Sequence, residues 1–247
     1  MKTIILTLLL FTTVISITAQ TTPTIKKWGF GAEVFPNSTF EIIKNDGSVD
    51  PNQEQFWNET EVAKFCLSGQ VYASYNLNKK SSLSIGLGYQ NTGNQTKNQQ
   101  LSFSNNIDSR GGFTYDSTTS SSFATHVKYK YNHHNIQIPV FYSYNISKRF
   151  YARGGVSTIF NFSNTITQVL IDFNGNKTPS TNKDMSTPQF RTLNFSGNLG
   201  FGYTYFQSSL FSLYAQANIE TTTLQLKKGA HLNRRPVSIG IILGVRI

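Results

Sequence analysis

The chain has 247 residues, 38% of them hydrophobic, and its 22 basic and 12 acidic residues give a formal net charge of +10. Its one cysteine, Cys66, excludes an intramolecular disulfide framework, and its length fits one all-β domain. The basic residues are dispersed and accompany no nucleic-acid-binding motif, so the net charge does not indicate a nucleic-acid partner.

The N-terminal residues form a targeting segment. Lys2 supplies a positive start, and residues 4–17 are apolar apart from small hydroxyl residues. This apolar stretch is shorter than the ~20 residues of a membrane-spanning helix, and Ala19 suits a cleavage position. We therefore predict a signal peptide over residues 1–19 and one outer-membrane β-barrel domain over residues 20–247.

Eight stretches of the mature chain alternate between apolar and polar residues, which is the period of a strand with two different faces. In the last stretch, Ile239 and Ile241 share one face while Ser238 and Gly240 share the other. The predicted strands cover residues 28–34, 67–77, 82–90, 136–146, 150–162, 193–205, 210–219 and 237–247.

Short and long connections alternate strictly between these predicted strands. Outer-membrane barrels show this asymmetry, with short periplasmic turns and long external loops. The sequence therefore predicts an all-β fold: an eight-stranded antiparallel up-and-down transmembrane β-barrel in a Gram-negative outer membrane, with short periplasmic turns and long extracellular loops. The short turns lie around residues 78–81, 147–149 and 207–209, and the long polar segments are 36–65, 91–132, 163–190 and 221–234.

A soluble barrel or sandwich would show the same alternation, with its apolar residues pointing inward. The loop asymmetry favours a membrane barrel instead, as do aromatic residues near the strand ends, where interfacial girdles belong. These aromatic residues are Trp28, Tyr75, Tyr89, Tyr144, Phe150, Phe162 and Tyr205.

If the apolar face meets lipid, the opposite face places polar and charged side chains in the lumen. An eight-stranded barrel is just wide enough for side chains to fill, and buried charges are costly unless they are paired. We therefore predict a structural ion-pair and hydrogen-bond cluster in the lumen, with a proton or ion pathway as the alternative. Its residues are Glu33, Gln70, Gln137, Arg153, Gln216, Glu220 and Arg246.

The four histidines, His126, His133, His134 and His231, fall in or beside the long connections. No carboxylate or cysteine stands beside them at metal-ligand spacing, and adjacent His133 and His134 point to opposite faces of a strand. We therefore expect solvated rim histidines, and we predict no catalytic residue, no metal site and no cofactor.

The first and last long segments carry opposite charge. Closing the barrel pairs the first and last strands, so these segments become neighbours, and we predict that they attract each other and partly cap the mouth. Two independently solvated loops are the alternative. The acidic residues are Glu41, Asp46, Asp50, Glu54, Glu59 and Glu61, and the basic ones are Lys227, Lys228, Arg234 and Arg235.

A second basic group lies at the predicted periplasmic rim. Long basic side chains at such a rim extend to phosphate head groups, so we expect them to contact outer-membrane lipid. These residues are Lys26, Lys27, Lys79, Lys80, Lys148 and Arg149.

Two neighbouring stretches resemble the PorT-like outer-membrane β-barrel family. The run HNIQIPV at residues 134–140, followed by FYARGG at residues 150–155, is similar to its pairing of an "IP-hydrophobic" strand with an "aromatic-x-x-x-Gly" strand. Residues 200–203 and 243–247 resemble its later strands. The resemblance implies an outer-membrane location and an eight-stranded barrel, and some members assist protein secretion machinery. It supplies no catalytic residue.

Two functions from different classes remain open. We predict a non-enzymatic outer-membrane protein, a structural or assembly- and secretion-associated component that contacts lipid and envelope or secretion-machinery proteins. The alternative is a lipid-A-modifying enzyme whose Ser, His and acidic residues converge at the extracellular rim. A porin ranks third, because eight strands leave no aqueous channel.

Overall fold

The computed structural model describes residues 27–45, 47, 50–101, 124–172, 174–182, 191–224 and 232–247. The predicted signal peptide at residues 1–19 lies outside them, as do Lys26, Lys227, Lys228 and His231. Among the described residues, no helix has the length and apolarity that crossing a membrane would require.

The described chain is almost entirely β-structure. Its elements are β1 (Trp28–Asn45), α2 (Pro51–Thr60), β2 (Glu61–Asn76), β3 (Ser81–Thr92), β4 (Asn94–Thr96), β5 (Gln99–Gln100), β6 (Ala124–Asn145), β7 (Phe150–Asp172), β8 (Lys177–Asn182), β9 (Leu193–Gln207), β10 (Ser212–Thr222) and β11 (Leu232–Arg246).

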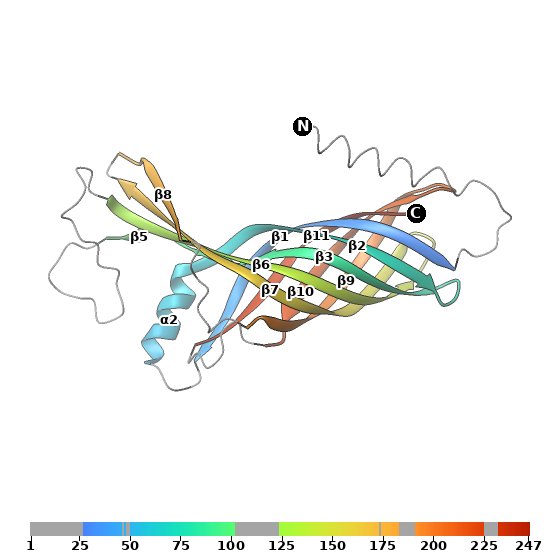
Figure 1. The fold of residues 1–247 in the computed structure, drawn as a ribbon, viewed down its shortest axis with the longest axis horizontal. Helices are drawn as coiled ribbons and strands as arrows, with labels where there is room; N and C mark the ends of the chain where they lie inside the picture. The colour runs from blue at the N-terminus through green and yellow to red at the C-terminus, as the bar shows by residue number, and fades with distance from the viewer. Residues whose placement is uncertain are drawn as a thin grey trace.

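Eight long strands pair antiparallel in a cycle. The order is β1–β2–β3–β6–β7–β9–β10–β11, and β11 pairs again with β1. The other three strands, β4, β5 and β8, are short and pair with the ends of longer strands. Figure 1 shows β5, β8 and α2 at one end of the molecule and the C-terminus at the other.

The two faces of the long strands have opposite character. On β3, Leu83, Ile85 and Leu87 are 45–56% exposed, whereas Ser82 and Ser84 between them are buried. The alternative of a soluble barrel with an apolar interior is therefore wrong for the described strands. We call the exposed apolar side chains of these strands the apolar belt: Phe30, Val34, Phe65, Leu67, Val71, Leu83, Ile85, Leu87, Ile136, Ile138, Val140, Val156, Phe160, Leu199, Phe201, Ile219, Ile239, Ile241 and Leu243.

Hydrogen bonds close the three tight turns, which lie where the sequence predicts them. The amide of Leu77 donates to the Ser81 carbonyl at 2.9 Å, and the amide of Ile146 donates to the Phe150 carbonyl at 2.9 Å. In the third turn, the Ser208 amide donates to the Phe211 carbonyl at 2.9 Å. We call the end of the molecule that carries these turns the short-turn end.

The first predicted loop is wrong at both of its ends. β1 continues to Asn45 and β2 begins at Glu61, so only the middle of residues 36–65 is free of strand. That middle contains α2, which Asp50 caps by accepting a hydrogen bond from the Asn52 amide at 2.9 Å, with proline at the start of the helix.

The other three predicted loops are also shorter than expected. β3 runs to Thr92 and β6 begins at Ala124, with β4 and β5 between them. β7 continues to Asp172 and pairs with β8, and the connection between β10 and β11 covers only residues 223–231. Beyond the apolar belt the apolar residues no longer alternate with polar ones, since Ile42 and Ile43 on β1 are adjacent, as are Val169 and Leu170 on β7, while the backbone pairing continues.

Candidate functional site

Four aromatic side chains fill the lumen near the short-turn end. Tyr72, Phe141, Tyr151 and Tyr214 are 1–6% exposed. Each lies opposite a glycine on the next strand, and a Cβ added to that glycine would approach ring atoms of its aromatic neighbour to 2.1–2.4 Å. The aromatic rings therefore occupy space that only glycine leaves open. The glycines, in the same order, are Gly31, Gly155, Gly202 and Gly244.

An ion pair between Glu33 and Arg153 lies beside this aromatic layer. Arg153 Nη2 donates to Glu33 Oε2 at 3.0 Å, and Nη1 donates to Oε1. The side chains are 1% and 3% exposed, respectively. The Arg153 guanidinium also lies 3.8 Å from the centroid of the Phe141 ring. Bidentate geometry and a stacked guanidinium are the arrangement in which a buried arginine and carboxylate satisfy each other best.

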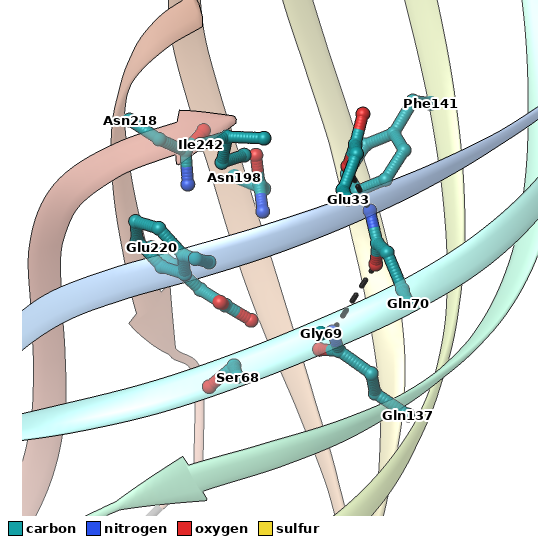
Figure 2. Close-up of a pocket in the computed structure, with 11 residues that line it drawn as sticks. Glu33, Ser68, Gly69, Gln70, Gln137, Phe141, Asn198, Asn218, Glu220 and Ile242 are labelled. Atoms are coloured by element: carbon teal, nitrogen blue, oxygen red, sulfur yellow. Dashed lines mark hydrogen bonds between the residues drawn. The ribbon is translucent and has the colours of Figure 1, made fainter. Parts of the chain in front are cut away.

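Neutral donors complete the coordination of the Glu33 carboxylate. The Tyr214 hydroxyl donates to Oε1, and Gln70 Nε2 donates to Oε2. The Tyr72 and Tyr214 hydroxyls lie 2.8 Å apart, and Gln137 Nε2 donates to Gln70 Oε1 at 3.2 Å (Figure 2). The structure thus joins four residues of the predicted cluster, Glu33, Gln70, Gln137 and Arg153, in one network.

Two further predicted residues, Glu220 and Gln216, belong to a separate group. The Glu220 carboxylate accepts hydrogen bonds from Gln90 Nε2 at 2.8 Å and Ser196 Oγ at 2.6 Å, and both donors are neutral. Gln216 Nε2 donates to Asn218 Oδ1 at 3.0 Å. Neither residue is hydrogen-bonded to the Glu33 network among the described contacts.

Arg246, the seventh predicted residue, lies on the short-turn side of the aromatic layer. Its guanidinium is 5.4 Å from the centroid of the Tyr214 ring. Arg246 also interacts with the Tyr72 side chain, so it joins the Glu33 network through Tyr72 and Tyr214. The prediction of one cluster is therefore correct for five residues and wrong for Glu220 and Gln216, and it missed the aromatic residues of the network. Each of these aromatic residues lies an even number of positions from a predicted lumen residue on its own strand, as Tyr72 does from Gln70, so strand alternation was a signal that could have found all four.

A small cavity, with room for about one water molecule, lies between the Glu33 network and Glu220 (Figure 2). Ser68, Asn198 and Asn218 contribute to its lining. Within the described residues, the buried atoms Asn198 Oδ1 and Asn218 Nδ2 have no hydrogen-bond partner. Its polar lining suits ordered water rather than an apolar ligand.

A second ionic group closes the lumen at the opposite end. Arg234 Nη1 lies 3.2 Å from Glu41 Oε2 and also contacts Glu61 Oε1. The Trp57 ring of α2 lies 4.9 Å from the Arg234 guanidinium. The predicted attraction between the first and last long segments is therefore present at Arg234, whereas Arg235 is exposed.

Glu61 gives this ionic group a titratable member beyond the apolar belt, which begins at Phe65 on β2. Burial raises the pKa of the Glu61 carboxyl and the nearby Glu41 carboxylate raises it further, while Arg234 opposes both effects. A raised folded-state pKa means that the folded protein takes up a proton here more readily than the unfolded chain. The contribution of Glu61 to the free energy of unfolding therefore declines as the pH rises from 4.5, the ordinary pKa of a glutamate, through the raised pKa of Glu61 in the folded protein.

The expectation of solvated histidines is wrong for His133. This side chain is buried, with Nε2 at 3.6 Å from Glu41 Oε1 and Nδ1 at 2.7 Å from Asn164 Oδ1. The two histidines point to opposite faces of β6, as predicted: His134 points outward, and its Nδ1 lies 2.5 Å from the Tyr89 hydroxyl. Sequence spacing missed the carboxylate near His133 because β1 supplies it across the lumen. Within the described ranges, no group of three or more His, Cys, Asp or Glu side chains could hold a metal ion.

We predict that Arg234→Gln frees α2 from the barrel mouth. The substitution removes the cation that contacts Glu41, Glu61 and the Trp57 ring, interactions worth about 1–2 kcal/mol together. Chymotrypsin cleavage at Phe56 and Trp57 should accelerate about tenfold, since cleavage follows the population of the locally open state. Arg235→Gln, a neighbouring exposed arginine, is the matched control, and equal acceleration in both variants would contradict this account.

A family model described as "Outer membrane protein beta-barrel domain" matches residues 18–219. No curated protein matches the chain significantly. Among solved structures, Neisserial surface protein A is similar at 11% identity and a TM-score of 0.39, over 90% of this chain and 97% of that one. The attachment invasion locus protein Ail of Yersinia pestis is similar at 8% identity and a TM-score of 0.39, over 90% of this chain and 99% of that one. The outer membrane protein OprG of Pseudomonas aeruginosa is similar at 11% identity and a TM-score of 0.34, over 90% of this chain and 96% of that one.

Proposed function

The chain belongs to the outer membrane protein β-barrel domain family and is an outer-membrane protein, and we propose that it crosses that membrane as a plugged eight-stranded barrel with a structural or assembly role. In this proposal the short-turn end faces the periplasm, and α2, β5 and β8 lie outside the cell. In this proposal the protein is not an enzyme and needs no cofactor.

The apolar belt supports the transmembrane arrangement. Its side chains point away from the lumen and are 36–70% exposed, a surface that water would not favour over so large a contiguous area. Aromatic pairs lie beside the belt at the short-turn end, as the ring centroids of Trp28 and Tyr75 are 5.0 Å apart and those of Phe150 and Tyr203 are also 5.0 Å apart. Such aromatic residues favour the membrane interface.

The filled lumen is the observation that carries the proposed role. The Glu33–Arg153 pair joins β1 to β7 across the lumen, and the aromatic layer lies beside it. An open aqueous passage needs a wider barrel, so a porin function is disfavoured. A plugged barrel can act through its two ends, and the resemblance of residues 134–140 and 150–155 to the PorT-like family favours a component of protein secretion or envelope assembly.

Cross-linking in intact outer membranes tests this role. A tagged protein would be affinity-purified after cross-linking, and its partners identified by mass spectrometry. We expect a stoichiometric envelope or secretion-machinery protein that is cross-linked to one end of the barrel. Recovery of the barrel alone at every cross-linker length would contradict the assembly role.

The second candidate is a lipid-A-modifying enzyme with an active site at the extracellular rim, where Tyr89 and His134 form an outward pair. The Phe162 ring lies 6.3 Å from the His134 ring, so the pair sits on the outer surface at the loop side of the belt. Mass spectrometry of lipid A tests this candidate. Lipid A from a strain that lacks the protein and from a strain that carries His134→Gln would each be compared with lipid A from the wild-type strain. We expect unchanged lipid A in both strains, and one shared mass change would establish the enzyme.

A further inference from the structure

A basic hollow opens at the short-turn end of the barrel. It encloses about 1120 Å³, including the part open to solvent. Lys79 and Lys80 of the β2–β3 turn and Lys148 of the β6–β7 turn stand on its rim. Arg246, Ser212 and Gln207 line it from β11, β10 and β9. Opposite sides of the strand cycle therefore contribute to one concave surface.

The charge of this hollow is of one sign. Its lining includes four basic side chains, and no acidic residue is among its lining residues. The nearest inward carboxylate, Glu33, is already paired with Arg153. The acidic side chains of the ionic group at the mouth, Glu41 and Glu61, lie at the opposite end of the barrel. A concave surface of one charge concentrates ions of the opposite charge.

The geometry separates the hollow from the lipid bilayer around the barrel. Gln207 pairs with Ser212, and Ser212 pairs with Arg246, in one register row. Arg246 in turn pairs with Gly31, which belongs to the inward face of β1. The hollow thus lies inside the ring of strands, whereas lipid head groups surround the ring. An anion that enters must come along the barrel axis.

We propose that this hollow binds an acidic, carboxylate-rich segment of a periplasmic protein, an inference that rests on the periplasmic orientation in the proposed function. Lysine and arginine side chains on the rim and floor donate hydrogen bonds to the incoming carboxylates. The aromatic layer behind Arg246 stops the segment from entering further. The hollow therefore gives the barrel a docking surface that is distinct from its external loops.

The test uses the full mature barrel in nanodiscs of phosphatidylcholine and a fluorescent oligo-(Asp-Gly) peptide, with binding measured by anisotropy. We expect saturable binding that added salt weakens and no binding of an oligo-(Asn-Gly) peptide. The combined substitution Lys79→Gln, Lys80→Gln and Lys148→Gln should weaken binding about tenfold or more, since each exposed charge contact contributes modestly. These three lysines lie in exposed turns, so the variant should fold.

The matched control lowers the net charge by the same amount, with three substitutions of lysine by glutamine at the other end of the barrel. Lys44, Lys97 and Lys177 are exposed there, and their combined substitution by Gln should leave peptide affinity unchanged. Equal weakening in both variants, or no binding to the wild type, would overturn the proposal.

The two proposals can fail separately. A barrel that binds the acidic peptide but is recovered alone from cross-linked membranes would contradict the assembly role and leave the anion site standing. A barrel that captures a stoichiometric partner but does not bind the peptide would contradict only the anion site, because the external end could then hold that partner.

Discussion

Arg153→Met should destabilise the barrel by about 3–5 kcal/mol, because it leaves the buried Glu33 carboxylate without a cation. The carboxylate would keep only its neutral donors, Tyr214 and Gln70. The substitution would also remove the guanidinium that lies over the Phe141 ring. Urea unfolding of the refolded protein in lipid, followed by tryptophan fluorescence, measures the change in the free energy of unfolding.

Two variants separate the lost charge pair from lost packing. Arg235→Met removes an exposed arginine and should change stability by no more than about 0.5 kcal/mol. The double variant Glu33→Gln, Arg153→Met removes both charges and should recover much of the loss, since no buried charge remains uncompensated. A double variant as unstable as Arg153→Met alone would contradict the view that an uncompensated charge causes the loss.

Gly244→Val should cost about 1–3 kcal/mol, as overpacking of a filled interior does. A Cβ at this position would approach the Tyr214 ring to 2.3 Å. Tyr214 would have to move, and its hydroxyl would lose its contacts with Glu33 and Tyr72. The same urea titration measures the loss.

Gly197→Val is the matched control for this prediction. Gly197 is also a strand glycine, and nothing lies within 4 Å of a Cβ added there. We expect this variant to be as stable as the wild type. If both glycine substitutions had the same cost, the loss would be a general effect of adding a side chain to a strand glycine of this barrel, and the tyrosine–glycine packing would not explain it.

The central parts of the strands were predictable, because apolar and polar residues alternate along them. On β3, large apolar residues alternate with small ones, and the structure places the large apolar residues outside and the serines inside. On β11, Ile239, Ile241 and Leu243 lie outside in the same way, whereas Val237 and Ile242 are buried. The contact of Arg234 with Glu41 was also predictable, since closing the ring makes the first and last strands neighbours. These predictions needed only the two-residue period of a strand and the closed order of strands in a barrel.

The alternation of polar and apolar residues placed Glu33 and Arg153 in the lumen and predicted an ion-pair cluster there, but it could not say which lumen residues contact each other. Glu33 and Arg153 lie on β1 and β7, which are not neighbours in the strand cycle, so no pairing rule brings them together. The burial of His133 against Glu41 has the same cause. The extent of β1 and β7 beyond the belt was missed for a different reason, because apolar and polar residues do not alternate there: Ile42 and Ile43 are adjacent on β1, and residues 169–171 are adjacent apolar residues on β7.

The most direct test of the membrane barrel is the accessibility of single nitroxide labels in a bilayer. In a Cys66→Ser background, cysteines would replace Leu83, Ser84, Ile85 and Leu87 on β3 and carry the label. We predict that oxygen dissolved in the lipid relaxes the labels at Leu83, Ile85 and Leu87 strongly and the label at Ser84 weakly, with a period of two. Uniform relaxation along β3, or stronger relaxation at Ser84 than at its neighbours, would contradict an apolar belt that faces lipid.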